Sequence, residues 1–157
     1  LRGWVSNSVD WPTLLKLRCI MNIITVEGSN KKRRLLAEEV VSFCIQKLMS
    51  RMRTLDIEVV LTNVNDAYGY CHSISNREFE IEIDKKLKEN DFISTVAHEM
   101  VHVWQYATKQ LTQKGCREFW KGKDYTKTSY SKQPWERQAL RMEKQLLKEF
   151  KKIRKLR

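Results

Sequence analysis

One short segment, His98-Glu99-Met100-Val101-His102, restricts the possible folds more than any other part of the 157-residue chain. In an α-helix each residue advances by about 100°, so two histidines four residues apart lie on one face, one turn apart. The neighbouring apolar residues repeat at the same helical spacing, and they are Ile93, Val96, Ala97, Met100, Trp104 and Ala107. The sequence therefore predicts a helix from Asn90 or Asp91 to about Leu111 that buries one face and presents both histidines beside it.

The remaining segments show strand and helix patterns. In 78–84 the apolar Phe79, Ile81 and Ile83 alternate with acidic residues, which predicts a strand with one buried and one acidic face. Further strands are expected at 21–26, 57–62 and 68–73, and an amphipathic helix at 32–53 after a turn at 28–30. We expect a long loop at 112–133, and Pro134 stands where it can start a final helix that runs to near the C-terminus.

Together these elements predict an α+β fold with one small mixed or antiparallel sheet. The sheet would pack on an N-terminal helix, the His-Glu-x-x-His helix and a long C-terminal helix. A length of 157 residues suits a single domain. We assign residues 21–157 to that domain and residues 1–20, which precede the first methionine, to an N-terminal extension. No apolar run approaches the ~18 residues that a membrane span needs, so no membrane partner is expected.

The histidine pair has the spacing of a zinc site. Two imidazoles one helical turn apart can both reach a tetrahedral Zn²⁺ ion, and Glu99 can hold and deprotonate a water molecule on that ion. Zinc lowers the pKa of such a water and polarises a substrate carbonyl, while a carboxylate moves the proton. The sequence thus predicts Zn²⁺ as a cofactor, with His98 and His102 as ligands and Glu99 as the catalytic base.

A third protein ligand has several candidates. The only other histidine, His72, lies upstream of the motif. On the last helix Glu136 falls within an apolar arc, where a carboxylate is costly unless it is paired or binds a metal. That arc consists of Trp135, Ala139, Leu140, Met142, Leu146, Leu147, Phe150 and Ile153. We expect Glu136 to be the third ligand, and Glu143 to be either a fallback ligand or a carboxylate that orients a histidine.

The run 96–105, Val-Ala-His-Glu-Met-Val-His-Val-Trp-Gln, followed by Pro134-Trp135-Glu136 and Ala139, resembles known metallopeptidases. It is similar to zincins of the gluzincin type, and to small SprT-like and phage-encoded metallopeptidases, over roughly residues 57–145. The resemblance implies a minimal zincin-like domain in which His98, His102 and Glu136 bind zinc and Glu99 is the general base. It also implies that 78–84 is the edge strand along which an extended peptide lies. The chain departs from the SprT-like pattern because no histidine follows His102.

The same resemblance implies a side chain that stabilises the oxyanion formed during hydrolysis, commonly a Tyr or a His. Tyr130, shortly before Pro134, is the nearest candidate. Tyr125, Tyr106 and His72 are the competing candidates.

Positive charge is concentrated in the last third of the chain. The net charge is +11, and residues 107–157 hold 16 basic against 5 acidic side chains, so residues 1–106 are neutral overall. Such a field attracts phosphates or an acidic partner in a salt-dependent way. A nucleic acid is therefore an expected partner besides a protein or peptide substrate, although a solvated helix face is the simpler explanation.

The cysteines bear on the compartment. Cys19, Cys44, Cys71 and Cys116 stand far apart and form no Cys-x-x-Cys pair, which favours buried free thiols over a disulfide framework or a zinc ribbon. We expect a reducing location, the cytoplasm, or the host cytoplasm or virion if the chain is phage-encoded.

The function expected from these features is that of a zinc metallopeptidase, an HExxH endopeptidase. Two alternatives stay open. One is a catalytically silent zincin-type protein used for interaction or phage assembly, against which the intact Glu99 argues. The other is a nucleic-acid-associated protein with structural zinc, which needs four protein ligands where the sequence offers three.

Overall fold

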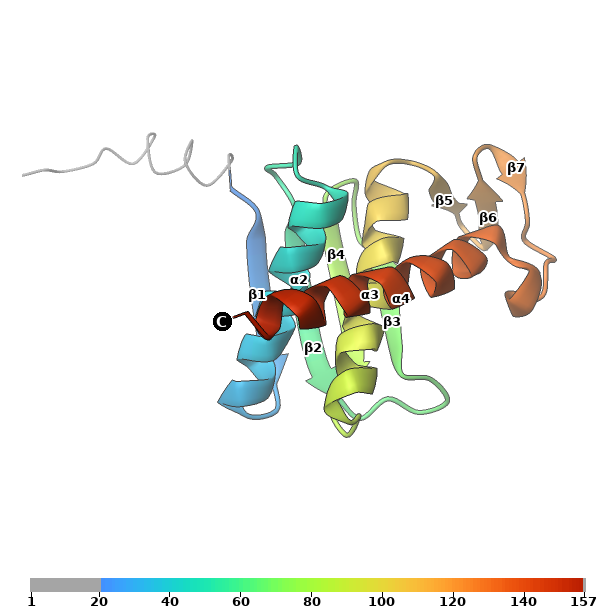
Figure 1. Ribbon diagram of the computed structural model, residues 1–157. Coiled ribbons are helices and arrows are strands. Elements are labelled where there is room, and N and C mark those ends of the chain that lie inside the picture. Colours follow the sequence, from blue (N-terminus) through green and yellow to red (C-terminus); the bar gives the residue numbers. More distant parts are fainter. Residues whose placement is uncertain (1–20, 157) are drawn as a thin grey trace, which may run out of the picture.

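A computed structural model describes residues 21–156 of the chain (Figure 1). The first half contains β1 (Ile23–Gly28), α2 (Lys31–Leu48), β2 (Asp56–Thr62), β3 (Gly69–Ser73) and β4 (Glu78–Asp84). The second half contains α3 (Glu89–Ala107), β5 (Leu111–Lys114), β6 (Arg117–Trp120), β7 (Lys123–Asp124), the short 3₁₀ helix η1 (Tyr130–Lys132) and α4 (Pro134–Arg154). The expected α+β class with a small mixed sheet is confirmed.

The main sheet has the strand order β1-β2-β4-β3. Strands β1, β2 and β4 run parallel, and β3 is antiparallel to β4 at the end of the sheet. The strand expected to lie at the edge, 78–84, is β4, and it lies inside the sheet between β2 and β3. The edge prediction was therefore wrong: β3 and β4 form a hairpin, and β4 also pairs with β2 along its whole length.

Alternation along β2 and β4 gives the sheet two different faces. The parallel register places Ile57 beside Phe79 and Val59 beside Ile81, and all four are buried. The acidic residues of both strands alternate with them and therefore project from the opposite face. A one-residue shift of either strand would bury these carboxylates, so the pattern fixes the register.

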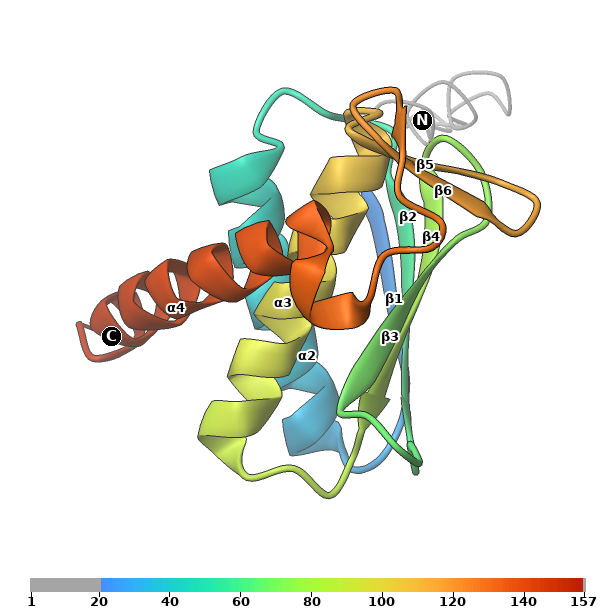
Figure 2. The same cartoon turned by 90° about the vertical axis from the view of Figure 1, so that its right-hand side faces the viewer.

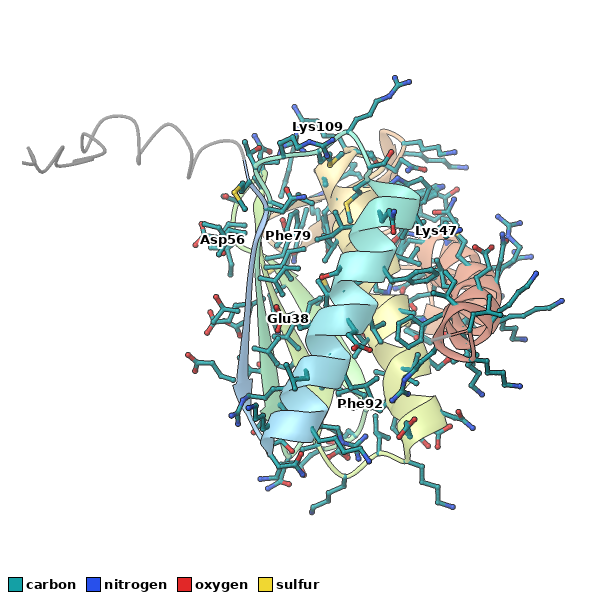
Figure 3. All side chains as sticks on the ribbon, turned by 60° about the vertical axis from the view of Figure 1, so that its left-hand side comes forward. Glu38, Lys47, Asp56, Phe79, Phe92 and Lys109 are labelled. Atoms are coloured by element: carbon teal, nitrogen blue, oxygen red, sulfur yellow. The ribbon has the colours of Figure 1, made fainter. Side chains whose placement is uncertain are left out.

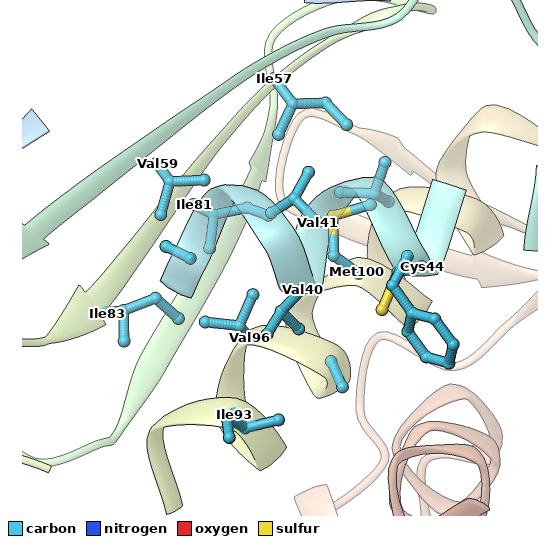
Figure 4. Close-up of a cluster of buried hydrophobic side chains, with 14 of the residues drawn as sticks. Val40, Val41, Cys44, Ile57, Val59, Ile81, Ile83, Ile93, Val96 and Met100 are labelled. Carbon is cyan, nitrogen blue, oxygen red and sulfur yellow. The ribbon is translucent and has the colours of Figure 1, made fainter. Parts of the chain in front are cut away.

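Helices α2 and α3 pack side by side on the apolar face of the sheet, and α4 crosses over them on the side away from the sheet (Figures 1 and 2). In the described part of the chain no helix covers the acidic face (Figure 2). The core lies between the sheet and the helices, with side chains such as Val40, Ile81 and Met100 in contact range (Figure 4). Phe43 of α2 and Phe150 of α4 meet edge to face at 5.4 Å between ring centroids.

The helix ends differ from the sequence expectations in a few places. Asn30 caps α2 as the turn suggested, because its side chain accepts a hydrogen bond from the Arg33 N–H at 2.9 Å. However, α2 ends at Leu48, and α3 begins after Lys88 without a side-chain cap, so neither Asn90 nor Asp91 caps it. The proline start of α4 is confirmed.

The apolar arc of α4 is narrower than expected. Trp135, Ala139, Leu146 and Phe150 are buried, whereas Leu140 and Ile153 are largely exposed. Leu140 lies at the margin of the arc, and Ile153 lies in the last turn of α4.

Residues 112–133 are not a loop throughout, which corrects the prediction. Strands β5, β6 and β7 form a second, antiparallel sheet, and η1 follows it. Its aromatic residues explain why it is ordered: Trp120 and Tyr125 pack on Trp135, at 6.4 and 6.1 Å between ring centroids. This small sheet thereby attaches to the start of α4.

The cysteine expectation holds only in part. Cys44 is a buried free thiol, Cys71 is half-buried and Cys116 is exposed. Cys19 and the assignment of residues 1–20 to an extension lie outside the described residues. Among the residues described, no helix has the length and apolar character needed to cross a membrane.

Candidate metal centre

Three side chains from two helices converge at the centre of the molecule. The Nε2 atoms of His98 and His102 lie 3.2 Å apart. Each Nε2 lies 3.3 Å from an oxygen of Glu136, Oε2 for His98 and Oε1 for His102. The structure thus brings together the three expected ligands in a triangle of side chains, in which each oxygen of Glu136 faces a different histidine.

The size of this triangle matches a tetrahedral zinc ion. Ligand atoms at about 2.0–2.1 Å from zinc, separated by a tetrahedral angle, are about 3.3–3.4 Å from one another. The two histidine Nε2 atoms are 3.2 Å apart, close to that value, and each has one Glu136 oxygen at 3.3 Å. Two imidazole nitrogens and one carboxylate oxygen are also a donor set that zinc prefers. The donor set and its spacing therefore fit a zinc ion.

Glu136 reaches the histidines because α4 starts beside α3 (Figure 2). Pro134 fixes the first turn of α4, and the buried Trp135 anchors that turn. Glu136 follows directly, and only 8% of it is exposed. Burial by itself would raise the pKa of Glu136, but hydrogen bonds from His102 and His98 outweigh it and hold the pKa well below its usual range. The carboxylate is therefore kept ionised.

Glu143 does not join the triangle. It lies seven residues after Glu136, and its Oε2 is 2.6 Å from Nδ1 of His98. Of the two roles open to it, the structure favours the carboxylate that orients a ligand histidine. Burial would lower the pKa of His98, but its hydrogen bonds to Glu136 and Glu143 raise the pKa to about 10. A metal cation bound to Nε2 of His98 would replace the proton on that nitrogen, while the proton on Nδ1 stays hydrogen-bonded to Glu143.

Gln105 plays the corresponding part for His102, and the sequence analysis did not identify it. Its side chain is fully buried, and its Oε1 lies 2.8 Å from Nδ1 of His102. Its Nε2 donates to the Trp135 carbonyl at 3.0 Å and to Oε1 of Gln138 at 2.8 Å. A backbone carbonyl only accepts hydrogen bonds, so the amide nitrogen must face Trp135 and the amide oxygen must face His102. Nδ1 of His102 is then the donor to Gln105, and when a metal replaces the proton that Nε2 shares with Glu136, the Nε2 lone pair faces the metal.

A signal for Gln105 is visible in the sequence with hindsight. It follows His102 by three residues, next to Val103 and Trp104 in an apolar stretch. An uncharged polar residue there is either exposed or hydrogen-bonded inside. Only the position of α4 decides between these two outcomes, because both partners of the amide nitrogen belong to its first two turns.

Glu99 lies beside the triangle without belonging to it. It is 6% exposed and has no hydrogen bond or ion pair to the described residues. Burial raises its pKa above the usual value, and the nearby His102 and His98 offset part of that effect. A raised pKa brings a carboxylate closer to the value that suits a general base near neutral pH.

An open cleft of about 980 Å³ gives access to the cluster. The segment before β3, β3 itself and one face of α3 along most of its length form part of its wall, and α4, η1 and the β5–β6 hairpin form the rest. Tyr130 lines the cleft near Glu136, and partial burial together with this carboxylate raises the pKa of its hydroxyl. Tyr106 also lines it, with a pKa raised to about 12 chiefly by burial.

The other candidates lie elsewhere. Tyr125 packs against Trp135 and does not line the cleft. His72 projects from the acidic face of the sheet, where it lies 3.7 Å from Glu82. With Glu80 these residues form a second group whose donor atoms are close together, but it is solvent-exposed and separate from the cleft. His72 is therefore not part of the candidate centre.

The cleft is acidic although the protein is basic. Besides the central carboxylates, Asp66, Asp91 and Glu118 line it, and among the described residues no lysine or arginine does. Asp91 precedes His98 by two helical turns and lies on the same face of α3, about 10 Å away along the helix axis. Asp66 precedes β3. The cleft therefore favours positive charge on whatever occupies it.

No protein-family model, curated protein or solved structure matches this chain. The similarity to zincin and SprT-like peptidases consequently stays a prediction from the sequence motif.

Proposed function

We propose that the protein is a zinc-dependent metallopeptidase that hydrolyses peptide bonds in a protein or peptide substrate. The observation that carries the proposal is the triangle of His98, His102 and Glu136 side chains, with contacts of 3.2 to 3.3 Å between their donor atoms and with Glu99 free beside it in an open cleft. Three protein ligands with an open side are typical of catalytic zinc sites, whereas structural sites use four.

In this proposal each residue has a defined task. Bound zinc would supply Lewis acidity, lowering the pKa of water and polarising the substrate carbonyl. Glu99 accepts the proton of the attacking water and passes it to the leaving amine. Tyr130 extends into the cleft close to Glu136, where its hydroxyl can donate a hydrogen bond to the oxyanion. Glu143 and Gln105 hold the two imidazole rings in place.

An extended peptide is the substrate form that the cleft suits best. Gly69, Tyr70 and Cys71 of β3 line the cleft, and β3 has only one neighbouring strand, β4, in the described chain. Its second edge is thus available to pair with a substrate backbone. Gly69 permits the close approach of β3 to α3, because a Cβ there would lie 2.9 Å from Cγ2 of Thr95.

The two alternative functions have less support. A structural zinc site would need a fourth protein ligand, and Glu143 contacts the outer nitrogen of His98 instead. A silent site would not need a buried, unpaired carboxylate at position 99, since such a group costs stability. We also expect a reducing compartment such as the cytoplasm, the host cytoplasm or a virion, because the described cysteines are all free thiols.

The test combines zinc content with chelator-sensitive proteolysis of an unfolded, casein-like protein. Wild type should bind about one zinc ion and cleave the substrate, and Glu99→Gln should keep its zinc but lose a factor on the order of 10² or more in turnover. His102→Ala should lose both zinc and activity. His72→Ala is the matched control, because it removes the one histidine outside the cleft.

Two outcomes would overturn the proposal. Unchanged zinc content in His102→Ala would mean that the triangle is not the metal site. A fully zinc-loaded wild type without activity on varied substrates would favour the silent alternative. Equal proteolysis by wild type and Glu99→Gln would point to a contaminating protease.

A further inference from the structure

Helix α4 has two faces with opposite chemistry. Its inner face packs on α3 through Trp135, Ala139 and Leu146, and it carries Glu136 and Glu143 to the metal centre. Its outer face carries only basic residues among its charged side chains. Figure 3 views α4 close to its axis, with many nitrogen-tipped side chains extending into solvent.

The basic residues form a continuous row, here called the α4 cationic face. Its exposed members are Arg137, Arg141, Lys144, Lys148, Lys152 and Lys155. At 100° per residue they fall within an arc of about 80° that is centred opposite Ala139 and Leu146. The three acidic residues of α4, Glu136, Glu143 and Glu149, all lie outside this arc. The row extends over 18 residues, which is about 27 Å of helix.

These cations are not neutralised within the described chain. Ion pairs at the protein surface engage other basic residues, Lys47 with Glu149 and Arg154 with Glu89. None of the six members of the α4 cationic face has an ion pair or a side-chain hydrogen bond to residues 21–156. Like charges three or four residues apart destabilise a helix. A polyanion bound along the row would therefore stabilise the folded protein.

The shape of the row selects among polyanions. A membrane surface is disfavoured, because a helix that lies on a bilayer inserts an apolar face, and the apolar face of α4 is buried on α3. A nucleic acid offers one phosphate per about 3.4 Å of each strand, so about 27 Å of helix spans a run of regularly spaced charges. Arginine and lysine supply many of the phosphate contacts in protein–DNA complexes, and such contacts carry no sequence information.

We propose that the α4 cationic face binds the phosphodiester backbone of a nucleic acid without preference for base sequence. The proposal is independent of the peptidase activity, since the face points away from the metal centre. About five phosphate contacts predict a salt dependence in which log K falls with log [salt] at a slope near −4.5 on duplex DNA.

The test measures binding of a fluorescein-labelled duplex of mixed sequence, about 20 base pairs long, by anisotropy over a range of NaCl concentrations. The triple variant Arg141→Gln/Lys144→Gln/Lys148→Gln should weaken binding at least tenfold at low salt and reduce the slope by about 2.7. The control Lys85→Gln/Lys86→Gln/Lys88→Gln removes the same charge from an exposed segment before α3 and should change affinity less than threefold. Circular dichroism and zinc content should remain those of wild type in both variants.

Several results would overturn the inference. Equal loss of affinity in the two triple variants would show that net charge, and not the α4 face, attracts the DNA. A wild-type slope shallower than about −2 would show too few phosphate contacts. Stronger binding to polyglutamate or to anionic phospholipid vesicles than to DNA of equal charge would assign the face to an acidic protein or to a membrane.

Discussion

Replacing Gln105 by Leu tests whether the hydrogen bonds behind His102 determine metal affinity. The side chain is fully buried and makes three hydrogen bonds, to His102, Trp135 and Gln138. Leucine of similar size leaves the Nδ1–H of His102 without a partner and removes the hydrogen bond to the Trp135 carbonyl. An unpaired buried donor costs about 1–3 kcal/mol and a lost hydrogen bond about 1 kcal/mol, so we expect the free energy of unfolding to fall by about 2–4 kcal/mol.

Zinc affinity should fall as well. Without the amide oxygen, nothing in the structure fixes the proton of His102 on Nδ1 or the orientation of its ring. Loss of such an outer hydrogen bond costs about 10- to 100-fold in metal affinity, or about 1.4–2.7 kcal/mol. Gln105→Glu should separate the two effects. A carboxylate still accepts from His102 and keeps zinc affinity within about threefold of wild type, but it faces the Trp135 carbonyl and lowers stability.

The assays are urea unfolding of the zinc-free protein and zinc titration against a chromophoric chelator. Gln110→Leu is the control, since the side chain of Gln110 hydrogen-bonds only to the side chain of Thr108, away from the metal centre. It should change both quantities little. If Gln105→Leu binds zinc as tightly as wild type, or if Gln105→Glu loses as much affinity as Gln105→Leu, the role assigned to Gln105 is wrong.

Three more predictions concern protonation, substrate and packing. The pKa of His98 is raised to about 10 in the folded protein, against about 6.5 in an unfolded chain. Protonation of His98 therefore stabilises the zinc-free protein fully below about pH 6.5, and the urea midpoint should fall as the pH rises through about 10. Because Asp91 lines the cleft, peptides with lysine about three residues from the cleaved bond should be cut roughly 2- to 5-fold faster than glutamine analogues. Asp91→Asn should abolish this preference, whereas the control Asp56→Asn, on the acidic face of the sheet, should keep it. Gly69→Ala should lower the free energy of unfolding by about 1–3 kcal/mol in chemical denaturation, because the added Cβ would lie 2.8 Å from the Glu82 carbonyl oxygen. Wild-type stability of this variant would refute the close approach of β3 to its neighbours at Gly69.

The sequence alone determined the features that depend on neighbours within one element. Helical spacing placed His98 and His102 on one face of α3, and alternation made Ile81 of β4 a core residue. Pro134 marked the start of α4, and Glu136 stood out as a carboxylate inside an apolar arc. Each of these follows from a period of 3.6 or 2 residues or from a local backbone restriction, so no distant contact is needed to predict it.

Only the tertiary structure decided how the elements meet. Glu136 and Glu143 share a face of α4, and the crossing of α4 over α3 decides which carboxylate faces Nε2 and which faces Nδ1 of His98. The same crossing buries Gln105 against the Trp135 carbonyl. Strand order, which made β3 and not β4 the edge, depends on backbone pairing between segments far apart in the chain. Such pairings leave no periodic trace in either segment, because every strand offers the same backbone donors and acceptors to any partner.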